Sequence, residues 1–222
     1  MDAKRIRTTP ALRPGLSRVH IVFLVEERSA EVALNHLLPT MVGDRATFQI
    51  RPFNGKADLL QSLERQLRGL SLGIPGVRFV VLVDLDDDDC QELKRQLDET
   101  ATVVGLRTPS ATGDGAIQIV NRIAIEELEA WFFGDPTALR AAYPGVSATL
   151  ERKAPFRNPD AIHGGTWEAL LRVLQRAGYY KRATLPKLEN ASLIAQHMDP
   201  ARNRSRSFQV FKAGLERVLA DG

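Results

Sequence analysis

The sequence has little of what disulfide-bonded, zinc-binding or membrane proteins need. A single cysteine, Cys90, occurs in 222 residues, which excludes an internal disulfide. Only four histidines accompany it, none paired by spacing, which argues against a structural zinc site. The longest apolar runs are strand-sized, and the N-terminal residues are polar and basic. We therefore expect a cytoplasmic protein with no membrane-spanning segment.

The chain also lacks a Gly-x-x-x-x-Gly-Lys-Ser/Thr sequence, so it has no loop of the kind that holds the phosphates of ATP. What it does have is an ordinary globular composition, with 44% hydrophobic and 26% charged residues. A chain of this length can form one large domain or a core with a smaller appendage.

Strands and helices are predicted to alternate over the first 135 residues. Apolar, β-branched runs predict strands at 18–25, 46–53, 77–83 and 116–125. Helical spacing of apolar residues predicts helices at 30–41, 56–70, 88–104 and 126–133. This alternation predicts an α/β fold, with a mostly parallel sheet and helices on both of its faces.

The pattern changes after residue 135, where strand-like runs disappear. Helices are predicted at 136–143, 166–177, 185–198 and 207–220. We therefore expect a flexible arm at 1–17, an α/β domain at 18–135 and a basic helical extension at 136–222. Residues 1–136 carry a net charge of −4 and residues 137–222 one of +7, counted from the sequence. That asymmetry suits an enzyme with an acidic metal site and a basic substrate-binding region. The alternative is a chance gradient of charge along the chain.

The densest group of acids directly follows an apolar run. Residues 84–89 read Asp-Leu-Asp-Asp-Asp-Asp and follow the predicted strand at 77–83. Asp84 and Asp86 are two residues apart, so in an extended conformation their side chains project from the same side. Carboxylates held together repel, and a hard divalent cation relieves that repulsion. The alternative is a solvated turn that starts the next helix, which explains the later aspartates better than Asp84.

Acids follow three of the four predicted strands. Glu26 and Glu27 follow the first strand, Asp84 ends the third, and glutamates including Glu129 follow the fourth. Ligands of open α/β sheets bind beyond the carboxyl ends of the strands, so a shared metal site is expected there. Glu126 and Glu129 are expected on one face of a helix. Glu129 precedes a run of aromatic residues, and an acid beside so much apolar surface usually has a partner or a cation.

Two of these motifs resemble the TOPRIM signature, which has a Glu after the first strand and an Asp-x-Asp after a later one. Here they are Glu26 and Asp84-Leu85-Asp86. TOPRIM domains occur in topoisomerases, primases and OLD-family nucleases, where they bind Mg²⁺ for phosphodiester chemistry. The chain departs from the signature at Glu27, which stands where a glycine usually allows a tight turn.

The TOPRIM resemblance covers about residues 18–135. Nearly the whole chain resembles a bacterial family catalogued as a domain of unknown function (family 4276) with a TOPRIM-like fold. The motifs that carry this resemblance are Asn54-Gly55-Lys56, residues 125–132, Gly164-Gly165-Thr166-Trp167 and residues 199–205.

The resemblance implies a TOPRIM-like (Rossmann-like) fold and a site for Mg²⁺ or Mn²⁺. Glu26, Asp84 and Asp86 carry over directly as catalytic and metal-binding residues, with Glu26 as an acid or base. Glu129 matches the later Glu of OLD-type TOPRIM domains, which helps to hold a second metal. Glu31 is a less certain match.

The basic C-terminal half contains a candidate phosphate-binding segment. Arg202, Arg204 and Arg206 alternate with small hydrogen-bonding residues just ahead of a predicted helix. The planar guanidinium group matches phosphate oxygens, so these arginines are expected to bind substrate. The alternative is a solvated loop whose arginines pair with acids of the same chain. Lys56, at a predicted helix start, is a further substrate-binding candidate.

These observations leave three hypotheses about function. The first is Mg²⁺-dependent phosphodiester chemistry on nucleic acid, most simply a TOPRIM-type nuclease in a phage-defence or DNA-processing system. The second is a regulatory or toxin-like module that depends on a separate ATPase chain. The third is a non-catalytic nucleic-acid-binding protein with a decayed site.

Overall fold

A four-stranded parallel sheet forms the centre of the molecule. The computed structural model describes residues 19–112, 114–181 and 186–220, so the arm expected at 1–17 lies outside the described residues. The strands pair in the order β2-β1-β3-β4, and every pairing is parallel. Their bounds are β1 Val19–Val25, β2 Ala46–Pro52, β3 Arg78–Asp84 and β4 Ile119–Ala124.

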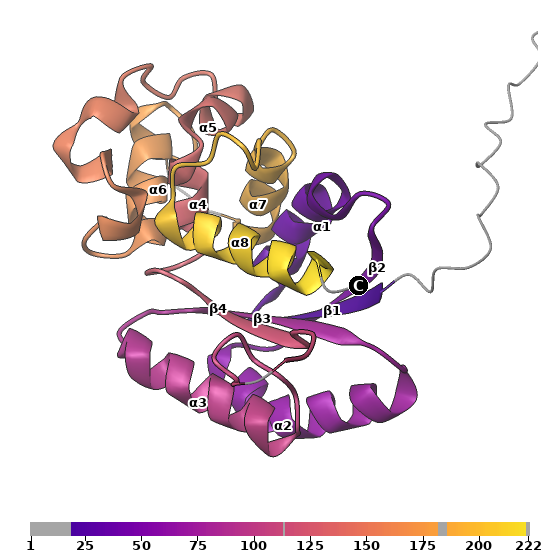
Figure 1. Cartoon of the computed structure of the whole chain (residues 1–222). Helices are drawn as coiled ribbons and strands as arrows, with labels where there is room; N and C mark the ends of the chain where they lie inside the picture. Colours follow the sequence, from indigo (N-terminus) through magenta and orange to yellow (C-terminus); the bar gives the residue numbers. More distant parts are fainter. Residues whose placement is uncertain (1–18, 113, 182–185, 221–222) are drawn as a thin grey trace, which may run out of the picture.

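Helices cover both faces of this sheet, as Figure 1 shows. One face carries α2 (Lys56–Gly73) and α3 (Cys90–Val103), and the other carries α1 (Arg28–Val42) with the C-terminal helices. The predicted α/β fold, with a parallel sheet, helices on both faces and a helical C-terminal part, is confirmed. Its element boundaries lie within a few residues of those expected from periodicity.

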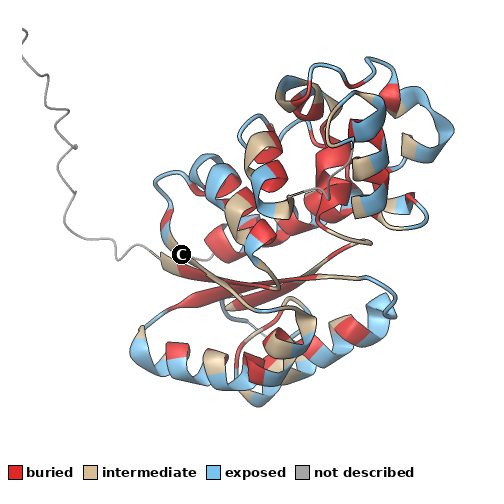
Figure 2. Cartoon of the chain, turned by 180° about the vertical axis from the view of Figure 1, so that it is seen from behind, coloured by how far each residue is buried: buried red, intermediate tan, exposed pale blue. Residues whose placement is uncertain are grey.

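Alternation along the central strands builds two separate cores. In β1, Ile21 and Phe23 face the layer of α1, whereas Val22 and Leu24 face α2 and α3. Both β1 and β3 are almost wholly buried, and the outward faces of α2 and α3 are exposed, as Figure 2 shows. Burial on both faces explains why these strands read as continuous apolar runs.

The C-terminal helices close the core on the α1 face. Trp131 packs against Phe208 and Phe211 with ring centroids 5.0 Å apart in both pairs, and its indole N–H donates to Ser207 Oγ at 3.0 Å. Phe211 in turn lies 6.5 Å from Phe23 of β1. These helices are α4 Glu129–Gly134, α5 Pro136–Ala142, α6 Thr166–Arg176, α7 Lys187–Ala195 and α8 Arg206–Ala220, with short 3₁₀ turns at Leu150–Arg152, Ala154–Phe156 and Pro159–Ala161. Within the described residues, no helix combines the length and the apolar character that crossing a membrane requires.

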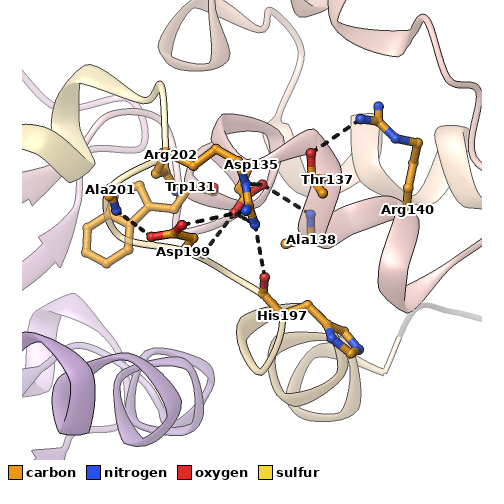
Figure 3. A network of polar contacts seen from close by, with 10 residues as sticks. Trp131, Asp135, Thr137, Ala138, Arg140, His197, Asp199, Ala201 and Arg202 are labelled. Carbon is orange, nitrogen blue, oxygen red and sulfur yellow. Dashed lines mark hydrogen bonds and ion pairs between the residues drawn. The ribbon is translucent and has the colours of Figure 1, made fainter.

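An ion pair between a buried aspartate and a partly exposed arginine joins the end of α4 to the loop before α8, as Figure 3 shows. The fully buried Asp135 accepts two hydrogen bonds from the guanidinium of Arg202, both at 2.9 Å. It also accepts from the backbone N–H of Asp199 at 2.9 Å and from that of Ala138 at 3.1 Å. Asp135 thus caps α5 and holds the 199–202 loop in place.

Two loops at the carboxyl ends of β3 and β4 depart from the expected geometry. Asp86 and Glu126 both have left-handed backbone, with φ of 49° and 61°. The expectation that Asp84 and Asp86 project from one side of an extended strand is therefore wrong, because the strand ends at Asp84. The expectation that Glu126 and Glu129 share a helical face is also wrong, because α4 begins at Glu129. The N–H of Asp86 donates to the carbonyl of Glu126 at 3.0 Å, and this contact pairs the two turns.

Candidate metal centre

The acids expected at the strand ends lie where the sheet changes direction. From β1 the chain runs outward to β2 and then crosses back to β3 on the other side of β1. Ligands of such sheets bind at this switch point, beyond the carboxyl ends of the two central strands. Glu26 follows β1 and Asp84 ends β3, so these two acids stand at the switch point. The Glu26 carboxylate accepts a hydrogen bond from the backbone N–H of Asp84 at 2.9 Å.

The pKa of the Asp84 carboxyl reflects both its burial and the acids around it. Burial raises its pKa well above the usual range, and the negative charges of Glu129, Glu26, Glu27 and Asp86 raise it further. Among these four charges, Glu129 acts most strongly on Asp84. The charges of acids after β1 and in α4 therefore act on Asp84 at the end of β3, and we call Glu26, Asp84 and Glu129 the carboxylate cluster.

Glu129 and Glu26 belong to the same cluster. Glu129 is 2% exposed, and burial followed by repulsion from Glu127 raises its pKa to about 7. For Glu26, burial raises the pKa, the hydrogen bond from Asp84 opposes the rise, and the charge of Asp86 adds to it. Neighbouring carboxylates with raised pKa values are the pattern expected where a cation is to be bound.

Asp86 differs from these acids because a lysine already neutralises it. The ammonium of Lys56 lies 2.9 Å from Asp86 and 2.6 Å from Asp88, and it donates to the carbonyl of Leu85 at 3.0 Å. Burial lowers the pKa of Lys56, but the hydrogen bonds to Asp88 and Asp86 outweigh burial, so the pKa is raised. Asp89, further along the acidic run, caps α3 by accepting from Gln91 and Glu92 at 2.9 and 2.8 Å. The helix-start alternative is therefore right for Asp89.

Lys187 is a member of the site that the sequence analysis missed. It opens α7, with its ammonium 3.7 Å from a carboxylate oxygen of Glu27 and 5.2 Å from the centre of the Trp167 ring. Burial lowers its pKa, but the charges of Glu27, Glu129, Glu127 and Asp84 raise it on balance. No motif marks this lysine, because it meets the acids only after α7 packs along α1.

Glu127 has a structural contact of its own. Its carboxylate accepts from the hydroxyl of Thr166 at 3.0 Å and from the backbone N–H of Trp167 at 2.8 Å. Both groups belong to the first turn of α6, so Glu127 serves as a cap that another segment provides.

We expect Glu127→Ala to lower the free energy of unfolding by about 1 kcal/mol, the usual cost of removing a helix cap. Urea denaturation followed by circular dichroism would measure this loss. The matched change Glu64→Ala, at an exposed acid in the middle of α2, should cost less than about 0.5 kcal/mol. Equal losses in the two variants would show that the contact to α6 contributes nothing specific.

The three arginines predicted to bind substrate lie apart from this cluster. Arg202 pairs with Asp135, which matches the alternative in which the arginine meets an acid of the same chain. Arg204 and Arg206 donate their backbone N–H groups to Gly134 and Asp160, and both side chains are exposed. No hydrogen bond or ion pair joins the three side chains to the predicted metal ligands in the part of the chain that the structure describes. Their role toward substrate stays a prediction.

The carboxylates suit a hard divalent cation. In this structure two lysines form ion pairs with acids of the site. Across residues 19–112, 114–181 and 186–220, no three His, Cys, Asp or Glu side chains converge closely enough to hold a metal ion. Positive charge comes instead from Lys56 beside Asp86 and from Lys187 beside Glu27. The donors are all carboxylate oxygens, which Mg²⁺ and Mn²⁺ prefer, and the most buried of them repel one another.

Comparison with known proteins identifies the family. The family model described as "Domain of unknown function (DUF4276)" matches residues 25–216. The chain belongs to this family. The match begins at the last residue of β1 and extends into α8, so the DUF4276 unit includes both the carboxylate cluster and the helices that follow it.

Among solved structures, this DUF4276 chain is similar to the C-terminal region of the Burkholderia pseudomallei OLD protein. The two are 15% identical, with a TM-score of 0.48 over 92% of this chain and 100% of the other. No curated protein matches the sequence.

Proposed function

We propose that this protein carries out divalent-metal-dependent phosphodiester chemistry on nucleic acid, as a nuclease of the TOPRIM type. The observation that carries the proposal is the meeting of Glu26 and Asp84 at the switch point of the sheet, together with the charge of Glu129 acting on Asp84. Three separate segments contribute to it, and all three carboxyls have raised pKa values. Acids whose burial and mutual repulsion raise their pKa values destabilise the folded state when they are charged. Such a group is typical of a functional site.

Glu26, Asp84 and Glu129 would hold the ion, with Asp86 as a further ligand once it is released from Lys56. A bound Mg²⁺ or Mn²⁺ would stabilise negative charge on the phosphate oxygens and lower the pKa of a bound water. The strained turns at Asp86 and Glu126 support this assignment, because left-handed non-glycine backbone tends to be retained at functional sites.

The two lysines have distinct roles in this proposal. Lys56 is 15% exposed and stays charged, so it can contact a phosphate oxygen when Asp86 turns to the ion. Lys187 is held over the Trp167 ring and beside Glu27, where it reduces the repulsion among the acids before an ion binds. Glu26, fixed by the backbone of Asp84, is positioned to take up or deliver a proton at its carboxylate.

Metal binding by Glu26 is directly testable. We expect Glu26→Gln to weaken Mn²⁺ binding at least about 10-fold in calorimetric titration, and to slow cleavage of DNA or RNA to a similar extent. Glu64→Gln, at an exposed acid of α2 that the proposal does not use, removes the same charge and should leave both quantities near those of the parent. Both measurements use the purified chain with single- and double-stranded substrates.

The results separate this proposal from its alternatives. Carboxylate-dependent Mn²⁺ binding without cleavage by the purified chain would favour a module that works with a separate ATPase, since this sequence has no P-loop. Mn²⁺ binding that is unaffected by Glu26→Gln would contradict the proposed site. A non-catalytic nucleic-acid-binding protein would then be the better description.

A further inference from the structure

A groove lies along the free edge of the sheet and is lined by residues other than those of the carboxylate cluster. β4 is an edge strand, and in Figure 1 α8 lies above it and α3 below it. Two adjoining cavities of about 450 and 260 Å³ open between these elements and share Lys94, Arg122, Arg206 and Val210. Together they have the size of a small-molecule site.

The larger cavity is strongly basic. Arg122 comes from β4, Arg206 and Arg217 from the two ends of α8, and Lys94 from α3. Among the described residues that line the two cavities, Asp98 is the one acid, and its charge is already matched by Lys94. Asp98 also acts on Arg122, so one acid of the lining faces Lys94 and three arginines, and the cavity keeps an excess of positive charge.

Arg122 is the central residue of this basic group. Its Nε is buried and has no hydrogen-bond partner among the described residues, although Nη1 donates to the carbonyl of Asn121 at 2.8 Å. Burial and then the charge of Arg217 lower the pKa of Arg122, and the charge of Asp98 only partly opposes them. A partly buried guanidinium that lines the cavity next to a second arginine is an arrangement that an anion would stabilise.

Gly214 of α8 allows the guanidinium of Arg122 to lie here. A Cβ atom at position 214 would stand 2.2 Å from Arg122 Nε and 2.4 Å from one of its terminal nitrogens. Glycine in the middle of a helix costs about 1 kcal/mol relative to alanine. Glycine is needed at position 214 because any larger side chain would collide with the guanidinium of Arg122.

The smaller cavity differs in chemistry from the larger one. Ile123 and Ile125 of the β4 segment and Val210 of α8 line it, together with Cys90 at the start of α3. A basic cavity joined to an apolar one matches a ligand with a phosphate at one end and a planar base and sugar at the other.

We propose that this groove binds a nucleotide unit, with its phosphate on Arg122, Arg206 and Arg217 and its base against Ile123, Ile125 and Val210. The groove runs toward the carboxyl ends of the strands, where Ile125 precedes the strained turn at Glu126. A nucleic-acid strand lying in it would thus pass toward the carboxylate cluster. In that form the inference rests on the proposed function, whereas a free nucleotide would use the same phosphate contacts.

The test compares two pairs of arginines with the same change in charge. Arg206→Gln with Arg217→Gln removes two exposed arginines of the groove, and Arg65→Gln with Arg172→Gln removes two exposed arginines on α2 and α6. Fluorescence anisotropy with a labelled single-stranded DNA oligonucleotide, in EDTA, measures binding without metal. Each phosphate contact contributes a slope of about 0.7 to the dependence of log affinity on log salt for single strands. We expect the groove variant to bind roughly 20-fold more weakly at about 0.1 M salt, with the slope reduced by about 1.4.

The control pair should retain nearly the parent's affinity and slope. A second titration with ADP distinguishes the two sources of the phosphate. Loss of ADP binding in the groove variant, with oligonucleotide binding unchanged, would assign the groove to a free nucleotide. If neither ligand distinguishes the groove variant from the control pair, the inference is overturned. Because binding is measured in EDTA, a failure of the metal site would show separately, as loss of cleavage with the groove result intact.

Discussion

Replacing Asp84 by asparagine should remove metal-dependent cleavage while making the metal-free protein more stable. Asp84 is the acid on which the charges of the other site carboxylates converge, so its loss removes the centre of the proposed site. We expect a loss of cleavage on the order of 1000-fold, the scale found when one catalytic group is removed from other enzymes.

The gain in stability follows from the direction of the pKa shift. Burial and neighbouring charges raise the pKa of Asp84, so the folded protein holds its proton more tightly than the unfolded chain does. The stability contributed by the protonated form is present below about pH 4, and it is lost as pH rises toward the folded pKa. At neutral pH the charged carboxylate therefore opposes folding, and Asp84→Asn removes this opposition.

We expect Asp84→Asn to raise the unfolding free energy by about 1 kcal/mol at neutral pH in EDTA, or roughly 2–4 °C in Tm. The difference from the parent should vanish below about pH 4, where Asp84 is neutral in both folded and unfolded chains. Adding Mn²⁺ should stabilise the parent and leave the variant unchanged. Thermal unfolding followed by circular dichroism across this pH range checks all three outcomes.

Asp44→Asn is a suitable control, because Asp44 is an exposed acid in the turn after α1. Its change should be within about 0.5 kcal/mol and independent of Mn²⁺. An Asp84→Asn protein that is less stable than the parent in EDTA would show that the carboxylate serves folding. The electrostatic argument for a metal site would then lose its main support.

Replacing Asp135 by alanine should have the opposite effect and destabilise the protein by about 3 kcal/mol. Removing one partner of a buried ion pair costs roughly 3–5 kcal/mol, and the lower end applies because Arg202 is 43% exposed. The variant also loses the hydrogen bonds to the backbones of Ala138 and Asp199, so the N-terminus of α5 is left uncapped.

The loss should depend on pH in a definite direction. Burial alone would raise the pKa of Asp135, but the hydrogen bonds from Arg202, Asp199 and Ala138 outweigh it, so the pKa is lowered. A depressed carboxyl pKa gives stability that is present above about pH 4 and lost as pH falls through the folded pKa. The difference between Asp135→Ala and the parent should therefore be largest near neutral pH and shrink at acid pH.

A double-mutant cycle with Arg202→Met isolates the ion pair. Urea denaturation of the parent, both single variants and the double variant should give a coupling energy of at least about 1 kcal/mol at neutral pH. Coupling close to zero would mean that Arg202 is free to bind substrate, as the sequence analysis first suggested. Strong coupling would assign Arg202 to the scaffold.

The fold could be read from the sequence because local signals agree with the final structure. The central strands are buried on both faces and therefore read as apolar runs, and the amphipathic helices show their period directly. The errors fall where the backbone adopts unusual torsions. Nothing in a single sequence reveals that Asp86 and Glu126 take left-handed φ values, or that a hydrogen bond joins their turns.

The site was predictable only where its residues follow strands. Glu26 and Asp84 could be placed together because parallel strands bring their carboxyl ends to one edge. Lys187 and the Asp135–Arg202 pair could not, since they join segments separated by long stretches of sequence and carry no local pattern. Long-range ion pairs of this kind depend on how helices dock, which periodicity does not encode.

The docking of α8 on the sheet also limits how this protein can be cut or recombined. Phe208 and Phe211 fill the space between Trp131 and Phe23, so the last helix of the chain completes the interior beneath the first strand. A fragment ending at residue 135 would expose the apolar surface of Trp131 and Phe23 that α8 covers. We expect such a fragment to aggregate or to bind a chaperone. The acidic N-terminal part and the basic C-terminal part therefore share one core and should fold together. A fusion partner is best attached at a terminus.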